Sequence, residues 1–449
     1  MARSTRQQIA HLLRRAGFGA GAADLDYYTS LGFEGAVDRL VNYDSVDDTD
    51  TERAIARLRA DNPNPANAER PEAGNPALEM AAWLTRMLLT KRPLQEKMTF
   101  FWHGLLTSSI REVKVATLMA QQNALYRGMA LPTSYRDMIK AVARDPAMLV
   151  YLDNNTNVKG KPNENWAREL MELFTLGIGN YTEQDVKEAA RAFTGWTVQR
   201  GTGQFMFNPR QHDSDSKTFL GVTGNLDGDD VIDIIFSQPS HGKYVTRRIF
   251  RFFAYDDPDE ATVARFADIY LKSGYNVREL VTQILLSPEF RSDRAFFSIV
   301  KSPVEFSIGA LRALSANITN LRTWQGLNQQ MAVMGQQIYN PPDVGGWPGN
   351  VSWLNTTALF ARMEMARQLV SIENDATVDP LEIARANNIT TPTQAVDYFI
   401  DLLVQNDAPA DYKQSLLTFL GTFQNERDMN GKLRGLVRLI MATPVYQMN

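Results

Sequence analysis

Two carboxylates stand three residues apart in the segment NENWARELMELF, and they are the strongest candidates for chemistry in this sequence. On a helix this spacing places Glu169 and Glu172 on one face, one turn apart. Such a pair can divide the acid and base roles of a reaction between its members, or can bind a cation. Glu169 and Glu172 are therefore predicted as catalytic groups. The alternative is a solvated helix face with an Arg168–Glu172 ion pair, which is common and contributes little to stability.

Imidazoles are the other groups suited to proton transfer or metal binding, and the chain has 4 histidines. No two of them have the spacing of a zinc-binding His-Glu-x-x-His helix, so a metal site would have to be assembled from distant segments. His212, in the segment QHDSDSK, is predicted as a further catalytic group. A mixture of imidazole and carboxylate suits zinc, manganese or iron, and the predicted ligands of such a divalent metal are His103, His212, Glu169 and Glu172. The alternative is that each histidine is a hydrogen-bonded residue of a polar core.

Cationic and aromatic side chains in the same segments are the candidates for substrate binding. Arg168 and Lys217 are predicted to hold an anionic substrate. Trp196 and Trp347 are predicted to contact it as well, because tryptophan faces suit sugar rings. The segment YNPPDVGGWPGNVSWLN around Trp347 is too rich in proline to form a helix, so it is predicted to wall a pocket. Aromatic packing between helices explains the same residues equally well.

The elements that must position these residues are helices. On the side opposite the two carboxylates, apolar residues recur at helical spacing, which predicts the buried stripe Ala167, Leu170, Met171 and Phe174. This helix is predicted to begin near Asn163 and to end at Gly177 or Gly179. Thr182 and Asp185 then predict a capping box at the start of the next helix.

Similar periodicity along the chain predicts a mostly α, large multi-helix fold. The first helix is expected behind Thr5 as its N-cap, and others over residues 77–89 and 94–102. Three further helices share a pattern of arginine and aliphatic residues that ends in a capping residue before proline. These predicted caps are Asp145, Ser287 and Thr443.

The domain organisation predicted from these patterns is a single helical domain over residues 1–449. An exposed loop is expected at 62–76, where four prolines and no large apolar residue occur. An irregular insert is expected at 199–229, with strands at 204–207 and 218–222 that form one small hairpin. Residues 373–449 are expected to form a C-terminal helical subdomain.

Composition excludes several classes of protein. With 44% hydrophobic and 22% charged residues, the chain of 449 residues is neither disordered nor collagenous. Its net charge of −4 gives no overall attraction to nucleic acid or anionic lipid, and no apolar run is long enough to span a membrane. The absence of cysteine excludes disulfides and thiolate chemistry. No signal peptide is predicted, since Arg14 and Arg15 interrupt the first apolar stretch.

Several segments, taken in order, resemble the bacterial family catalogued as domain of unknown function 1800. The resemblance runs from His11 to about Tyr446 and rests on HLLRRAGFG, FWHGLLTSS, NENWARELMELFTLG with AFTGW, HDSDSKTFLG, KSPVEF and NPPDVGGWPG. One departure is that His103-Gly104-Leu105-Leu106 stands where relatives usually read His-Asn-His-Phe. If the second histidine of relatives is a ligand or base, this chain lacks it. The resemblance implies relatives that are often exported to the periplasm or beyond, and that often accompany a co-encoded sulfatase-like protein.

Two classes of function, enzymatic and non-catalytic, are therefore open. The first is an enzyme with a histidine and glutamate site, with or without a metal, that acts on an envelope or extracellular saccharide or on a sulfated or phosphorylated polymer. The second is a non-catalytic binding partner or escort of the sulfatase-like protein, or a structural envelope protein. The polar residues on one helix face favour the pocket of an enzyme.

Overall fold

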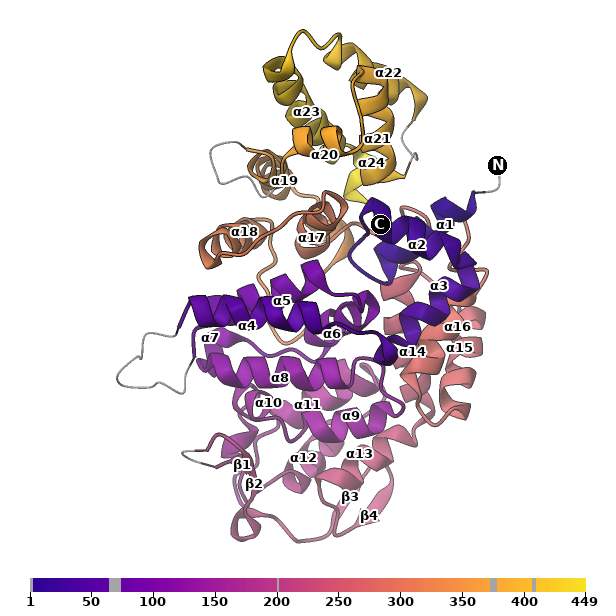
Figure 1. Cartoon of the computed structure of the whole chain (residues 1–449). Helices are drawn as coiled ribbons and strands as arrows, with labels where there is room; N and C mark the ends of the chain where they lie inside the picture. The colour runs from indigo at the N-terminus through magenta and orange to yellow at the C-terminus, as the bar shows by residue number, and fades with distance from the viewer. Residues whose placement is uncertain (1–2, 64–73, 200–201, 372–377, 406–408) are drawn as a thin grey trace.

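The chain folds into an almost entirely helical molecule, as seen in a computed structural model that describes residues 3–63, 74–199, 202–371, 378–405 and 409–449 (Figure 1). The mostly α fold predicted from the sequence is confirmed. Nearly all of the helices pack around one of two hydrophobic cores. Within the described ranges, no helix combines the length and apolarity needed to cross a lipid bilayer.

The first core lies among helices from the N-terminal and central parts of the chain. Helix α1 begins with a capping box between Ser4 and Gln7, one residue before the predicted cap Thr5. The helices of this core are α1 (Thr5–Arg15), α2 (Ala22–Ser30), α3 (Gly32–Val41), α6 (Pro93–Leu105), α8 (Ala116–Gly128), α9 (Tyr135–Val142), α10 (Pro146–Tyr151), α11 (Asn165–Glu169), α12 (Glu183–Ala192), α13 (Gly228–Phe236), α14 (Pro239–Phe253), α15 (Glu260–Lys272) and α16 (Val277–Leu286).

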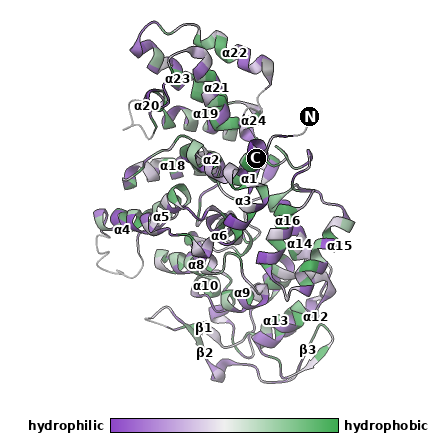
Figure 2. Ribbon diagram, turned by 45° about the vertical axis from the view of Figure 1, so that its right-hand side comes forward, coloured by the Kyte–Doolittle hydropathy of each residue, from purple (hydrophilic) through white to green (hydrophobic). Residues whose placement is uncertain are grey.

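The second core lies mainly among C-terminal helices. Its helices are α4 (Thr49–Asp61), α5 (Pro76–Leu89), α7 (Ile110–Val113), α17 (Pro303–Ala313), α18 (Leu321–Val333), α19 (Thr356–Leu369), α20 (Pro380–Ala386), α21 (Pro392–Val404), α22 (Ala410–Leu420), α23 (Glu426–Met441) and α24 (Pro444–Gln447). In both ribbon views, α19 to α24 gather at one end of the molecule (Figures 1 and 2). Residue 373, where a subdomain was predicted to begin, and most of the predicted loop 62–76 lie outside the described residues.

Two small hairpins occupy the opposite end of the molecule (Figure 1). Strand β1 (Trp196–Val198) pairs antiparallel with β2 (Phe205–Phe207), and β3 (Lys217–Phe219) pairs antiparallel with β4 (Val222–Gly224). The sequence predicted one hairpin, with a strand over 218–222. That strand is interrupted because Leu220 and Gly221 both adopt positive φ, of 45° and 83°, and form the two-residue turn between β3 and β4.

The helix that carries the two predicted carboxylates changes its geometry halfway along. It begins as α11 and continues as a π-helix over Leu170–Thr175, in which the Thr175 hydroxyl donates to the Leu170 carbonyl at 2.5 Å. The predicted stripe is buried. Gly177 ends the helix at φ 81°, with the ring of Tyr244 so close that a Cβ at Gly177 would lie 2.7 Å from its Cδ2. π-Helical turns are rare and occur often near functional residues.

Helix α6 connects the two cores. Its residue Phe100 belongs to the second core, whereas Phe101 and Leu105 belong to the first. Residues near both ends of the chain reach this junction, since Arg15, at the end of α1, and Asn449 both lie beside α6. Side chains from segments far apart in the sequence therefore meet beside α6.

Candidate functional site

The predicted acidic pair lies on one helix, and its two members have different surroundings. Both side chains are half-buried. Glu172 accepts a hydrogen bond from the Tyr181 hydroxyl at 2.8 Å. Glu169 makes no hydrogen bond or ion pair with any described residue, and burial, followed by the charge of Glu172, raises its pKa. Neither carboxylate lines the cavity described below.

Three of the predicted substrate-binding residues already have partners within the protein. Arg168 binds both carboxylate oxygens of Glu183 at 2.8 Å. Lys217 is buried and donates from Nζ to the backbone carbonyls of Asp213, at 2.6 Å, and Asp215, at 3.0 Å. Trp196 is buried beneath the guanidinium of Arg144. These contacts join α11 to α12 and hold the segments around the hairpins.

The two histidines predicted as metal ligands are held by the backbone of different segments. His212 Nδ1 lies 2.9 Å from the Thr194 carbonyl oxygen. His103 is fully buried, its Nε2 accepts a hydrogen bond from the Tyr339 N–H at 2.9 Å, and burial lowers its pKa to about 3. Across the described ranges, no three histidine, aspartate or glutamate side chains form a group that could hold a metal ion. The predicted ligands His103, His212, Glu169 and Glu172 are thus not gathered into one metal site.

A cavity of about 260 Å³ lies at the junction of the two cores, beside α6. Its walls come from the end of α1, from α6 and α14, from the start of α17, and from the loop between α18 and α19. Trp347, which the sequence predicted to wall a pocket, lines this cavity. The volume is near the lower end of small-molecule sites, about 300 Å³, and suits one ring with a substituent.

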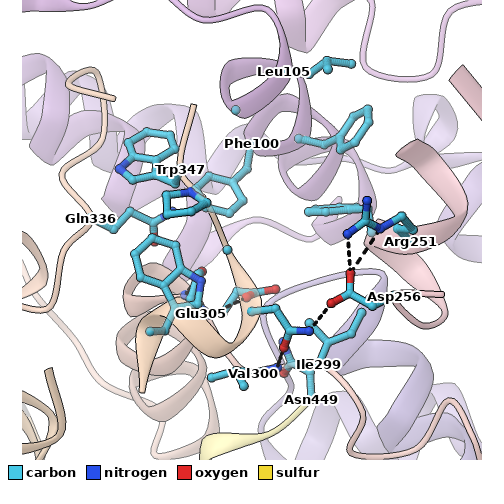
Figure 3. Close-up of a pocket in the computed structure, with 18 of the residues that line it drawn as sticks. Phe100, Leu105, Arg251, Asp256, Ile299, Val300, Glu305, Gln336, Trp347 and Asn449 are labelled. Carbon is cyan, nitrogen blue, oxygen red and sulfur yellow. Dashed lines mark hydrogen bonds and ion pairs between the residues drawn. The ribbon is translucent and has the colours of Figure 1, made fainter. Parts of the chain in front are cut away.

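One side of the cavity is aromatic. Figure 3 shows Trp347 and Phe100 there, across the cavity from Arg251, and Trp353 and Phe252 are further aromatic lining residues. Behind this wall the His103 ring packs against Trp347, with ring centroids 5.5 Å apart. The aromatic wall is therefore supported by a buried side chain of α6.

The loop that carries Trp347 is fastened to the end of α6 by its backbone. The Thr107 hydroxyl donates to the Val344 carbonyl at 2.6 Å, and the Ile110 N–H donates to the Tyr339 carbonyl at 2.7 Å. Gly346 adopts φ 80°, and a Cβ there would collide with the Gly104 carbonyl oxygen. Only glycine allows both this φ and this close approach of two backbone segments.

The opposite side of the cavity is a fixed polar network (Figure 3). Arg251 donates to Asp256 from Nη2 at 3.0 Å, and the side-chain amide of Asn350 donates to the same carboxylate. The side-chain oxygen Oδ1 of Asn350 in turn accepts the Val300 N–H at 3.1 Å. This chain of hydrogen bonds connects the loop after α14 to the loop before α19.

A buried ion pair lies at the base of the cavity. Glu305, which lines it, pairs with the fully buried Lys97 and accepts the Ser302 N–H at 2.8 Å. Burial disfavours the Glu305 carboxylate, but the charge of Lys97 and the hydrogen bonds from Lys97 and Ser302 outweigh it and lower its pKa. Glu305 is therefore ionised at neutral pH and is not a proton donor.

Two further arginines line the cavity with unused donors. Arg15 is buried and donates from Nη2 to the Ala295 carbonyl at 2.5 Å and to the Ser298 hydroxyl at 2.9 Å, while its Nε and Nη1 have no partner among the described residues. Burial lowers the pKa of Arg15 to about 9. The side chain of Arg248 makes no hydrogen bond or ion pair with any residue that the structure describes. The cavity thus joins an aromatic face to a cationic one.

Comparison with known proteins places the chain in a family. The family model described as "Protein of unknown function (DUF1800)" matches residues 11–448. The chain belongs to this family. No match was found among curated proteins or among solved structures.

Four of the six segments that carry the family resemblance contribute residues to the cavity. HLLRRAGFG provides Arg15, FWHGLLTSS provides Phe101, KSPVEF provides Glu305 and NPPDVGGWPG provides Trp347. The segment His103-Gly104-Leu105-Leu106 also reaches this cavity, because Gly104 and Leu105 line it.

Sequence reasoning missed the charged residues of this site. Arg15 interrupts the apolar stripe of α1, which is a signal of a buried charge that was available. Arg248 and Arg251 stand three residues apart on a basic helix, a pattern that also describes a solvated face. Glu305 was missed because its partner Lys97 comes from a distant segment, and Asp256 because the nearby Arg251 is only one of its partners, the other being the distant Asn350.

Proposed function

We propose that this member of the DUF1800 family binds a saccharide unit of an envelope or extracellular polymer in the cavity beside α6. The observation that carries the proposal is the pairing of an aromatic wall with an opposed, prearranged polar wall, Trp347 facing Arg251 and Asp256. Sugar rings combine an apolar face with hydroxyls at the rim, and this arrangement can contact both at once.

The same residues favour binding over acid–base catalysis inside the cavity. Glu305 is paired with Lys97 and has a lowered pKa, and Asp256 is engaged by Arg251 and Asn350. A general acid needs a carboxyl group that is protonated near working pH. We therefore propose recognition of the saccharide as the role of this cavity.

An enzymatic role for Glu169 is the second candidate, and one specific observation favours it. Its carboxyl group has a raised pKa and no partner among the described residues, as a general acid or base requires. Its position outside the cavity makes it separable from saccharide binding by mutation.

The test is a binding measurement on the full chain. An array of neutral and anionic oligosaccharides identifies ligands, and titration followed by tryptophan fluorescence measures their affinity. Trp347→Ala is expected to weaken binding by about tenfold or more, equivalent to about 1.4 kcal/mol. Phe207→Ala, which removes an exposed aromatic ring at the far end of the molecule, is the matched control and should bind normally. The proposal is wrong if no saccharide binds, or if both variants bind like the parent.

A further inference from the structure

We propose that Arg248 and Arg251 form a subsite for an oxoanion substituent of the bound saccharide, such as a carboxylate, a sulfate ester or a phosphate ester. This inference rests on the proposed function, because it places the anionic group on a sugar that the aromatic wall holds. It predicts that the natural ligand is an acidic polymer.

The first support is the arrangement of arginines on α14. Arg248 and Arg251 lie three residues apart, one helical turn, and both line the cavity. Arg251 is held in place by Asp256, with Nη2 at 3.0 Å and Nε at 3.2 Å from the same carboxylate oxygen. Arg247, which immediately precedes Arg248, does not line the cavity and pairs with Glu260. The helix therefore directs two of these three guanidinium groups to the cavity.

The second support is that the cavity has more cationic than anionic groups. Among the side chains that line it, three are arginines, Arg15, Arg248 and Arg251, against the two carboxylates of Asp256 and Glu305. Glu305 is in addition paired with Lys97, a cation that stands just behind the wall. An anionic ligand would offset this surplus.

Arg15 is a lining cation whose hydrogen-bond donors are not all satisfied within the described part of the protein. Its side chain is about 1% exposed, yet Nε and Nη1 have no hydrogen-bond partner there. A buried guanidinium with unused donors is costly, because it has lost water without full replacement. A negative charge in the adjoining cavity would stabilise it through the electrostatic field, even without direct contact.

The chemistry of the subsite follows from the guanidinium group. Its planar fork presents paired donors that match two oxygens of a carboxylate, sulfate or phosphate group. Figure 3 shows Arg251 facing the aromatic side across the cavity, so one sugar ring could stack on Trp347 while its substituent reaches α14. The small volume of about 260 Å³ allows both contacts with a single residue of a polymer.

The experiment uses one polymer backbone in four forms. The full chain is titrated with dextran, carboxymethyl dextran, dextran sulfate and dextran phosphate of equal length, at fixed ionic strength. Arg248→Gln and Arg247→Gln are compared with the parent, since each removes one charge from the same helix. Thermal unfolding of both variants shows that they are folded.

We expect at least one anionic dextran to bind about tenfold or more tightly than dextran. One charge-assisted hydrogen-bonded pair between a guanidinium and an oxoanion contributes enough binding free energy for this difference. Arg248→Gln should remove most of that preference, and Arg247→Gln should leave it unchanged. Which of the three derivatives binds tightest identifies the oxoanion. Inorganic sulfate or phosphate should compete only with the anionic forms.

Three results would overturn the subsite: equal binding of neutral and anionic forms, no binding of any anionic form, or equal losses in the two arginine variants. Failure of the saccharide proposal is distinguishable, because it would show as normal affinity of Trp347→Ala for every form. An oxoanion site without a sugar site would keep its dependence on Arg248 and show no dependence on Trp347.

Discussion

The imidazole of His103 accepts a hydrogen bond from the backbone N–H of Tyr339 at 2.9 Å and thereby joins the end of α6 to the loop of Trp347. The same ring packs edge-on against Trp83 and Tyr339 and lies against Trp347. A residue that the sequence marked as a metal ligand is, in this structure, a positioning residue for the aromatic wall.

Removal of the His103 acceptor should loosen this wall. His103→Ala leaves a buried N–H of Tyr339 unpaired and opens a void, so we expect the free energy of unfolding to fall by about 2–4 kcal/mol. His103→Gln keeps an acceptor oxygen and should lose less. Urea unfolding followed by tryptophan fluorescence measures both. Equal stability of the alanine variant and the parent would show that the hydrogen bond does not matter.

The buried histidines make the protein sensitive to acid. His103 and His241 each have a pKa lowered by burial to about 3, and burial also lowers that of His11. The unfolded chain takes up these protons near pH 6.5, so each group's contribution to stability is complete above that pH and is lost as pH falls toward 3. The loss is about 1.4 kcal/mol per pH unit and per histidine.

Asp145 acts in the opposite direction over part of this range. Burial raises its pKa to about 6, so its contribution to stability is present at low pH and is lost as pH rises through 6. Between pH 6 and 4 the three histidines outweigh this one carboxyl group. Unfolding free energies measured at pH 7, 6, 5 and 4 should therefore fall steadily, and a flat or rising profile would contradict the burial of these imidazoles.

The variant Glu169→Gln tests whether the acidic pair takes part in saccharide binding. Because Glu169 lies outside the cavity, the variant should bind saccharide like the parent. Its melting temperature should rise slightly at neutral pH, since a partly buried charge beside Glu172 is removed. Calorimetric titration and thermal unfolding check the two parts. Loss of saccharide binding in this variant would instead place the saccharide site at the helix that carries Glu169 and Glu172, as the sequence predicted.

Gly346→Ala tests the attachment of the Trp347 loop to α6. A Cβ at this position meets the Gly104 carbonyl, and φ 80° is strained for alanine by about 1–2 kcal/mol before the clash is counted. We expect a drop in melting temperature together with weaker saccharide binding. Gly179→Ala has φ 88° with no atom within 4 Å and lies outside the cavity, so it carries the strain without the clash. Equal effects of the two variants would rule out the close approach as the cause.

Local features of the fold were predictable from the sequence. The capping box of Thr182 and Asp185 and the caps at Asp145 and Thr443 are confirmed, because each depends on residues within three positions. Ser287 differs, since it ends α16 and its hydroxyl accepts the Phe290 N–H of a turn where no described helix begins. The β1–β2 pairing was missed because the sequence of Trp196–Val198 continues a helical segment.

The site was predictable only in the segment around Trp347, which also contributes Asn350 and Trp353, because the other groups depend on long-range assembly. Lys97 and Glu305 are separated by more than two hundred residues, and neither has a neighbour in sequence that reveals its burial. Lysine, arginine and glutamate are ordinarily exposed, so periodicity alone assigns them to the surface. For Glu169 and Glu172 the sequence predicts a shared helix face. It does not predict which residues of other segments lie against that face.

The most direct test of the saccharide site is a crystal structure of the full chain with the oligosaccharide that binds best on the array. The account predicts a sugar ring stacked on Trp347, within the cavity beside α6, and an acidic substituent of that sugar within hydrogen-bond distance of Arg248 or Arg251. A ligand bound elsewhere, for example against Glu169 and Glu172 with the cavity empty, would contradict it.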